Sequence, residues 1–178
     1  MLDQLIRLEQ DFNVSLFHSK VSNIFVLMMN SIMFQDMSRV YASLNDSMRN
    51  KIMNKINNLK QNQLTQLYDE LNVKKVSISS VDILEDRYVI KVLLVSRYLD
   101  YRIDSATKKY HDGNNQSRIE KNNYLTFELK RNHKKLGNAA HCPNCGASID
   151  FNYTGLCTYC NSQINKAEYD WILTSWEA

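Results

Sequence analysis

This chain of 178 residues has very little proline and glycine, with one proline and four glycines. Such scarcity argues against long flexible linkers. No stretch reaches the ~18 consecutive apolar residues that a membrane-spanning helix needs. The best candidate, IFVLMMNSIMF at residues 24–34, is too short and contains polar side chains. The N-terminus lacks a basic segment followed by an apolar one, so we expect no signal peptide.

What the chain does contain is enough apolar sequence for a real core. It is 44% hydrophobic and 23% charged, which is close to average globular composition and excludes wholesale disorder. The net charge is only +3, but it is unevenly distributed. Residues 1–72 are neutral, residues 73–139 carry 14 basic and 8 acidic side chains, and residues 140–178 carry 1 basic and 4 acidic ones. A basic middle beside an acidic end predicts either that the two dock on each other or that the middle faces an anionic partner.

Cysteine occurs only near the C-terminus, in the stretch HCPNCGASIDFNYTGLCTYCN at residues 141–161. The spacing is C-x2-C-x11-C-x2-C, formed by Cys142, Cys145, Cys157 and Cys160. Four thiolates bind zinc tetrahedrally at ~2.3 Å, and each CxxC turn brings two sulfurs to one metal. Gly146 follows the first pair, at a position where the backbone must adopt positive φ. This pattern is typical of a zinc ribbon.

Other uses of these cysteines fit less well. A thioredoxin-type redox site has a single CxxC at the start of a helix. Disulfides require an oxidising compartment. A catalytic zinc keeps an open position and usually includes His or a carboxylate, and His141 is the one competing ligand. We therefore predict one structural zinc ion with four thiolate ligands in a small zinc ribbon at residues 139–178, where the terminal YDWILTSWE forms a strand that closes the ribbon or clamps it to the sheet.

The first 71 residues predict helices. Residues 2–9 form a short amphipathic helix, and DFNVS at residues 11–15 interrupts it, with Asn13 or Ser15 as the next N-cap. Apolar residues from 16 to 32 then recur at i, i+3 and i+4. Asp36 caps a further helix over residues 37–44, and Asp46 or Ser47 opens another that runs to residue 71.

The pattern then changes to strands, about residues 73–135. Residues 73–84 and 87–103 are β-branched and aromatic, with residues 84–87 as a hairpin turn. Residues 104–123 are polar and predict a long exposed loop, and residues 123–135 resume alternation as a third strand. Helices followed by antiparallel strands predict an α+β domain at residues 1–138, with the helices packed on one face of a curved sheet.

Several motifs together resemble the Tim44-like domain family, and most of all its bacterial members that end in a zinc ribbon. They are DFNVSLF (11–17), MFQDMSRV (33–40), VLLVSRYLDYRID (92–104), KKYHDGN (108–114), YLTFELKR (124–131), CPNCGA, CTYC and YDWILTSWE (169–177). The resemblance implies a cone-shaped α+β fold similar to nuclear transport factor two, with a curved sheet wrapped around helices. It also implies association with a membrane surface and a tethering role.

We therefore expect a non-enzymatic binding, tethering or scaffold domain, on the cytoplasmic side or peripheral to a membrane. Its partner would be an unidentified protein or an anionic lipid surface, because anionic headgroups attract basic residues. A plain solvated surface is the alternative for the same basic residues. The candidate contacts are Lys108, Lys109, Arg118, Lys121, Lys130, Arg131, Lys134 and Lys135.

Two other classes of function were weighed. A ligand-binding or enzymatic pocket inside the cone would draw on polar residues of the strands, but no paired-carboxylate or triad spacing stands out, so we predict no catalytic residue. The polar candidates are Asp82, Tyr98, Asp100, Tyr101, Asp104, His111 and Asp112. Nucleic-acid binding is not expected, because phosphate binding needs positive charge and Lys166 is the only basic side chain after residue 139.

Overall fold

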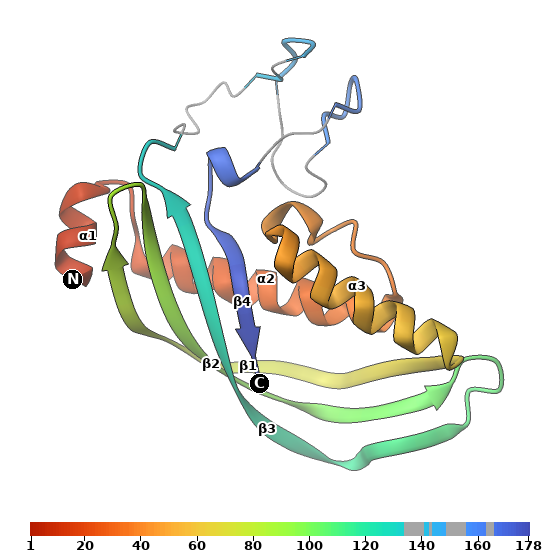
Figure 1. Cartoon of the computed structure of the whole chain (residues 1–178). Coiled ribbons are helices and arrows are strands. Elements are labelled where there is room, and N and C mark those ends of the chain that lie inside the picture. Colours follow the sequence, from red (N-terminus) through yellow and green to blue (C-terminus); the bar gives the residue numbers. More distant parts are fainter. Residues whose placement is uncertain (134–140, 143, 149–155, 163–165) are drawn as a thin grey trace.

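The computed structural model describes residues 1–133, 141–142, 144–148, 156–162 and 166–178 (Figure 1). Helices come first and strands follow, and the final strand lies at the C-terminus. The elements are α1 (Leu2–Leu8), α2 (Val14–Phe34), the short 3-10 helix η1 (Tyr41–Ser43), α3 (Asp46–Gln61), β1 (Leu64–Ile83), β2 (Arg87–Asp104), β3 (Tyr110–Lys130), the 3-10 helix η2 (Lys166–Glu168) and β4 (Ile172–Glu177).

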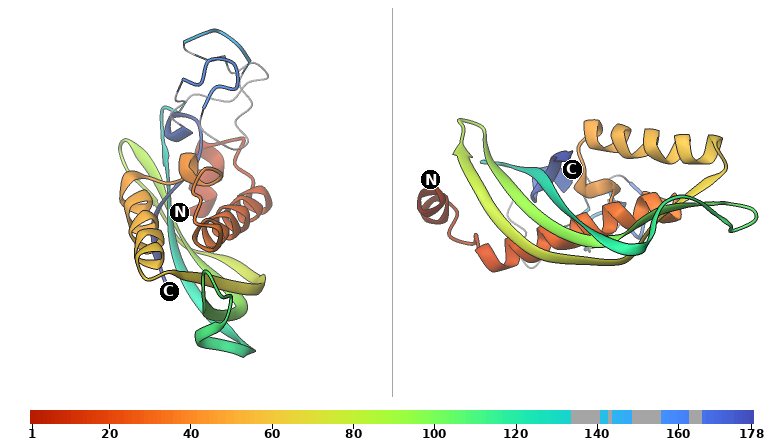
Figure 2. Two further views of the ribbon diagram at one scale, coloured as in Figure 1. Left: turned by 90° about the vertical axis from the view of Figure 1, so that its right-hand side faces the viewer. Right: turned by 90° about the horizontal axis from the view of Figure 1, so that it is seen from below.

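The four strands form one antiparallel sheet in the order β1-β2-β3-β4. The sheet is strongly curved, and the right-hand view of Figure 2 shows it as a crescent with α3 inside the curve. Three register shifts interrupt the pairing of β1 with β2, and such bulges bend a strand and increase its twist. The predicted fold class, an α+β fold with helices packed on a curved antiparallel sheet, is confirmed.

One face of the sheet is buried beneath the helices. On β2 the buried residues alternate along the strand as Tyr88, Ile90, Val92 and Leu94. From α2, the ring of Phe17 packs edge-on against Phe127 of β3, with 5.7 Å between centroids. This packing produces one continuous core between the helices and the sheet.

Two local predictions are confirmed. Asn13 is the N-cap of α2, and its side chain accepts a hydrogen bond from the backbone N–H of Leu16 at 2.9 Å. The β1–β2 turn lies where it was predicted, with the N–H of Leu84 bound to the carbonyl of Arg87 at 2.9 Å. The N-cap of α3, by contrast, is Asn45 and neither Asp46 nor Ser47.

The predicted helix ending at residue 71 is wrong beyond Gln61, because β1 begins at Leu64. Leu64, Leu67 and Leu71 have helix-like spacing, but the strand buries Leu64, Gln66 and Tyr68 instead. Pairing with β2 imposes this period of two. The hydrophobic pattern did not reveal this period, because Gln66, the middle one of the three buried residues, is polar.

The α-helix predicted over residues 37–44 is also wrong, since this segment contains turns, η1 and an isolated bridge from Leu44 to Leu173. Met37, Val40 and Leu44 are buried at helix-like spacing, although the backbone between them is not α-helical. The loop predicted over residues 104–123 is wrong as well, because β3 begins at Tyr110. Its polar side chains lie mostly on exposed positions of a strand whose backbone pairs with β2.

The terminal segment belongs to the main sheet. β4 pairs with β3, from Glu177 opposite Tyr124 to Ile172 opposite Glu128. Trp171 and Trp176 are buried in the main core. Of the two predicted roles for this strand, the described residues show attachment to the sheet. The predicted domain boundary between residues 138 and 139 lies outside the described residues.

Within the described part of the chain, none of the helices is both long and apolar enough to cross a membrane.

Candidate functional site

The four cysteines converge on one point. Their Sγ atoms all lie within 4.8 Å of one another. Sγ of Cys142 is 3.7 Å from that of Cys160, and Sγ of Cys145 is 3.6 Å from that of Cys157. A tetrahedral zinc ion with bonds of about 2.3 Å places its sulfur ligands about 3.8 Å apart, so the cluster has the dimensions of such a site.

The same backbone hydrogen bond closes both CxxC turns. In the first turn, the Cys142 carbonyl accepts the N–H of Gly146 at 2.9 Å, and in the second the Cys157 carbonyl accepts that of Asn161 at 2.9 Å. Gly146 and Asn161 both have positive φ, 72° and 57°. The expected positive φ of Gly146 after the first pair is confirmed, and Asn161 adopts the same conformation after the second pair, which explains why both pairs point to one centre.

Polar neighbours stabilise two of the sulfurs as thiolates. The Ser162 hydroxyl lies 3.1 Å from Sγ of Cys142 and 3.0 Å from Sγ of Cys160. It is the main cause of the lowered pKa of Cys142, and together with its own backbone N–H and Asn144 it lowers the pKa of Cys160 to about 6. Ser162 could not be singled out from the sequence, because a serine beside a cysteine pair has many uses.

The raised pKa of Cys145 shows why the cluster needs a cation. At Cys145 the backbone of Ala147 lowers the thiol pKa, but hydrogen bonds with the neighbouring sulfurs and burial raise it to about 12. Four thiolates at these distances repel one another, and a divalent ion removes that repulsion. The donor set, the distances and the closed arrangement therefore fit a metal ion held by Cys142, Cys145, Cys157 and Cys160.

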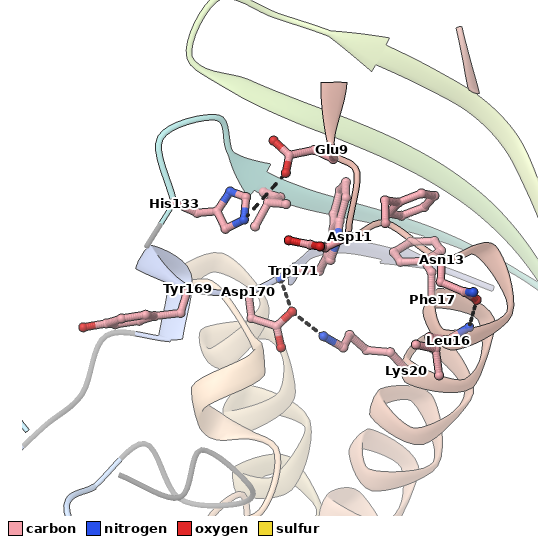
Figure 3. A pocket seen from close by; sticks show the side chains of 12 residues that line it. Glu9, Asp11, Asn13, Leu16, Phe17, Lys20, His133, Tyr169, Asp170 and Trp171 are labelled. Carbon is pink, nitrogen blue, oxygen red and sulfur yellow. Dashed lines mark hydrogen bonds and ion pairs between the residues drawn. The ribbon is translucent and has the colours of Figure 1, made fainter. Parts of the chain in front are cut away.

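A second feature is a pocket of about 340 Å³ between α2, β3 and the segment before β4 (Figure 3). Its apolar floor is an aromatic cluster in which the ring centroids of Phe12 and Phe17 lie 5.9 and 5.2 Å from Trp171. Leu16 is 70% exposed on its rim. The volume lies at the lower end of the range of ordinary ligand pockets.

Charged side chains surround this floor. Lys20 forms an ion pair with Asp170, whose carboxylate also accepts the N–H of Trp171 at 2.7 Å. Nε2 of His133 lies 3.9 Å from a carboxylate oxygen of Glu9, and both side chains are only 12% exposed. None of these residues was predicted from the sequence, because they come from four separate parts of the chain and no local motif links them.

The predicted basic contacts do not form one patch. Lys108 and Lys109 are exposed at the β2–β3 turn, at one end of the sheet. Lys130 and Arg131 lie at the other end of β3, where the N–H of Arg131 binds the carbonyl of Asp86 at 2.9 Å. About 20 strand residues, or roughly 65 Å along the chain, separate the two pairs.

The other predicted basic contacts lie elsewhere. Arg118 forms an ion pair with Glu70 at 3.3 Å. Lys121 is partly buried and pairs in register with the buried Ser96, so it lies on the helix-facing side of the sheet. Lys134 and Lys135 lie outside the described residues. Anion binding by these side chains therefore stays a prediction.

Most of the polar strand residues considered for catalysis have structural partners. Tyr101 donates a hydrogen bond to Asp69, and Arg102 pairs with Asp112. Asp104 caps the β2–β3 turn by accepting the N–H groups of Ala106 and Thr107 at 3.0 and 2.6 Å.

Four candidates remain, and two of them lie close together. Tyr98 and Asp100 share the helix-facing side of the sheet, where Gln66 donates to Asp100 at 2.9 Å. Asp82 and His111 are exposed.

A family model and a solved structure are similar to this chain. The model of the Tim44-like domain family matches residues 1–139. Among solved structures, the intermembrane space region of the chloroplast protein ARC6 is similar at 11% identity and a TM-score of 0.43, over 90% of this chain and 94% of that chain. None of the curated proteins compared with this chain matches it. The family match covers most of the sequence, and the chain belongs to the Tim44-like domain family.

Proposed function

We propose that this protein is a non-enzymatic binding or tethering domain that acts as a scaffold at the surface of a membrane or of a membrane protein complex. Membership of the Tim44-like family supports this role. The observation that carries it is a set of exposed apolar side chains on α1 and the β1–β2 turn, at one end of the molecule and near basic side chains.

These side chains are Met1, Ile6 and Leu8 on or beside α1 and Leu84 at the β1–β2 turn, and they are 62, 38, 46 and 47% exposed, respectively. α1 packs on β1 beside the β1–β2 turn, at one tip of the crescent (Figures 1 and 2). Arg131 places a positive charge at this tip, because its guanidinium lies 3.4 Å from the carbonyl of Leu84. Apolar side chains beside basic ones are the combination that holds peripheral proteins on anionic bilayers, at ~1 kcal/mol for each basic residue near the surface.

Co-sedimentation with vesicles of phosphatidylcholine, with and without phosphatidylserine, tests this proposal across a salt series. We expect binding to the anionic vesicles that weakens as salt rises and is lost in the Leu8→Asp/Leu84→Asp double variant. Met53→Asp is the matched control, because Met53 is similarly exposed, at 42%, but lies on α3. No binding to either kind of vesicle would overturn the membrane assignment and leave a protein complex as the anchoring surface. Equal binding to both kinds would refute the contribution of the basic side chains, and binding that survives the double variant would refute the α1 tip as the contact surface.

We further propose that the cysteine cluster is a structural zinc ribbon of the kind found in bacterial members of the family. Four thiolates select zinc over the hard cations, and a closed set of four leaves no position for catalysis. Elemental analysis of the purified protein should give one zinc per chain. Another metal at that stoichiometry would overturn the choice of zinc.

A second candidate function is binding of a small ligand in the pocket of Figure 3, favoured by its aromatic floor and charged rim. A fragment screen by protein NMR tests it. Hits that shift the Trp171 indole and the His133 ring together would support the pocket, whereas a screen in which neither signal moves would remove this candidate.

A further inference from the structure

Half of one sheet edge is open. β3 spans Tyr110–Lys130, but β4 pairs with it only from Tyr124 to Glu128. On the side away from β2, residues 110–123 have no strand partner anywhere in the described part of the chain. Figure 1 shows β4 ending beside α3 while β3 continues past it.

The usable part of this edge is short and has defined ends. On one side, the Asn114 side chain accepts the N–H groups of Gln116 and Ser117 at 3.1 and 3.0 Å, and this turn breaks the strand. The register with β2 slips at the same place, between Ile119 and Asn114. On the other side, Glu177 of β4 occupies the position opposite Tyr124. The open segment is therefore residues 119–123, about 17 Å long.

The edge of β4, in contrast, is protected. The N–H of Asn45 binds the carbonyl of Leu173 at 3.1 Å, and the Lys51 ammonium binds the carbonyl of Trp176. Exposed strand edges are templates for pairing with another chain, and proteins usually cover them. Residues 119–123 have no strand on this side among the described elements, and the one side-chain contact to their carbonyls is local, from the Asn123 amide to the Lys121 carbonyl at 3.3 Å.

One face of α3 carries two lysines, Lys51 and Lys55, near this edge. Lys51, Lys55 and Asn58 lie at i, i+4 and i+7 and so share one face of the helix. Nζ of Lys51 lies 5.4 Å from the ring centroid of Trp176, at the end of β4. Nζ of Lys55 lies 6.0 Å from the same centroid and 5.8 Å from that of Tyr68. These contacts hold both ammonium groups between the helix and the sheet.

The lysines of this region, Lys55 on α3 and Lys121 on β3, outnumber the carboxylates paired with them. Neither Lys55 nor Lys121 forms an ion pair within 4.0 Å of a carboxylate in the part of the chain that is described. Desolvation lowers the pKa of Lys55 although solvent still reaches its side chain; Asp100 opposes this effect, and Lys121, Arg102 and Lys51 add to it. Three cations therefore act on Lys55 against a single carboxylate, that of Asp100.

We propose that this edge binds an extended acidic segment of a partner protein. About five residues of the partner add to β3 at residues 119–123, in line with β4, with carboxylates directed toward Lys51, Lys55 and Lys121. A second copy of this chain fits less well, because symmetric antiparallel pairing centred on this segment places Lys121 opposite its own copy, and like charges directly opposite are destabilising. This surface is separate from the α1 tip, and the binding needs no lipid.

The probe is a fluorescein-labelled, acetylated and amidated peptide of alternating Glu and Val, titrated into the full zinc-loaded protein and followed by anisotropy. A Lys/Val peptide is the charge control. Two further versions of the Glu/Val peptide are N-methylated at alternate residues, one at the odd positions and the other at the even positions. Each keeps the charge of the peptide but loses the backbone N–H donors along one of its two edges, which strand pairing requires. We expect the Glu/Val peptide to bind and to shift the amide signals of residues 119–123, the Lys/Val peptide not to bind, and one of the methylated peptides to fail.

Charge-reversal variants locate the site. Lys55→Glu and Lys121→Glu should each weaken binding roughly tenfold, since attraction becomes repulsion. Lys91→Glu is the matched control, because Lys91 is exposed on the opposite face of β2 and the net charge changes equally. Equal loss in the control, binding of the Lys/Val peptide, or full affinity of both methylated peptides would overturn the proposal. Dimerisation blocked by Lys121→Glu would overturn it in favour of a second copy. None of these outcomes bears on vesicle binding at the α1 tip.

Discussion

Replacing Cys142 by serine should remove the metal and unfold the cysteine segment while leaving the sheet domain intact. In the described residues, the segment's own buried cluster contains only Cys142 and Cys157, with Cys160 and Tyr169 packed against them. Burying two cysteine side chains contributes about 2 kcal/mol. A structural zinc in a small module contributes about 10 kcal/mol or more, so the metal dominates the stability of this segment.

The rest of the protein should not respond. None of the four cysteines belongs to the main core, which contains both Trp171 and Trp176. The far-UV circular dichroism and the tryptophan emission of Cys142→Ser should therefore match those of the wild type. Zinc measured by elemental analysis should fall from one per chain to a small residue, and limited proteolysis should cut between residues 141 and 162.

Thr158→Ala is the control, because Thr158 is exposed within the second CxxC turn and is not a ligand. It should retain one zinc per chain and resist proteolysis. The reasoning would be refuted if Cys142→Ser kept its full zinc content. It would also be refuted if Cys142→Ser lost its tryptophan signal together with its metal, since that would place the cysteines in the main folding unit.

Three further predictions concern the sheet domain. Leu173→Ala should lower the free energy of unfolding in urea by about 3 kcal/mol, because Leu173 is fully buried, whereas Leu84→Ala at the exposed turn should change it by less than about 0.5 kcal/mol. Asn45→Ala should cost about 1 kcal/mol in the same assay, because the Asn45 side chain caps α3. Hydrogen bonds from the backbone and hydroxyl of Thr107 hold the pKa of Asp104 below 3.8, so its stabilisation is present above that pH and is lost as the pH falls through the lowered pKa. The thermal midpoint of Asp104→Asn should accordingly fall less steeply than that of the wild type below about pH 4, and parallel curves would contradict this assignment.

Features set by neighbouring residues could be predicted from the sequence. The N-cap at Asn13 depends on a side chain and an N–H three residues away, and the β1–β2 turn depends on four consecutive residues. The cysteine site also belongs here, because each CxxC turn positions two sulfurs through local hydrogen bonds. In these cases the interacting groups are adjacent in the chain, so the pattern contains the interaction.

The first half of β1 shows why other elements could not be predicted. Its leucines repeat with a helical period, and only pairing with β2 selects the strand, through partners such as Tyr68 with Asp100. Residues 110–123 are polar enough to form a loop, yet their backbone pairs with β2. In both segments, the deciding hydrogen bonds come from a distant part of the chain.

By itself, the sequence determined the α+β class, the family and the set of four cysteines that could hold a metal ion. Only the tertiary structure decided that the terminal strand joins β3, that the basic residues are divided between two ends of the sheet, and that residues 119–123 form an open edge beside Lys55. These features depend on pairs such as Phe127 and Leu173, which are far apart in the chain and adjacent in the sheet. Composition and spacing record which groups are available, whereas strand register decides which of them meet.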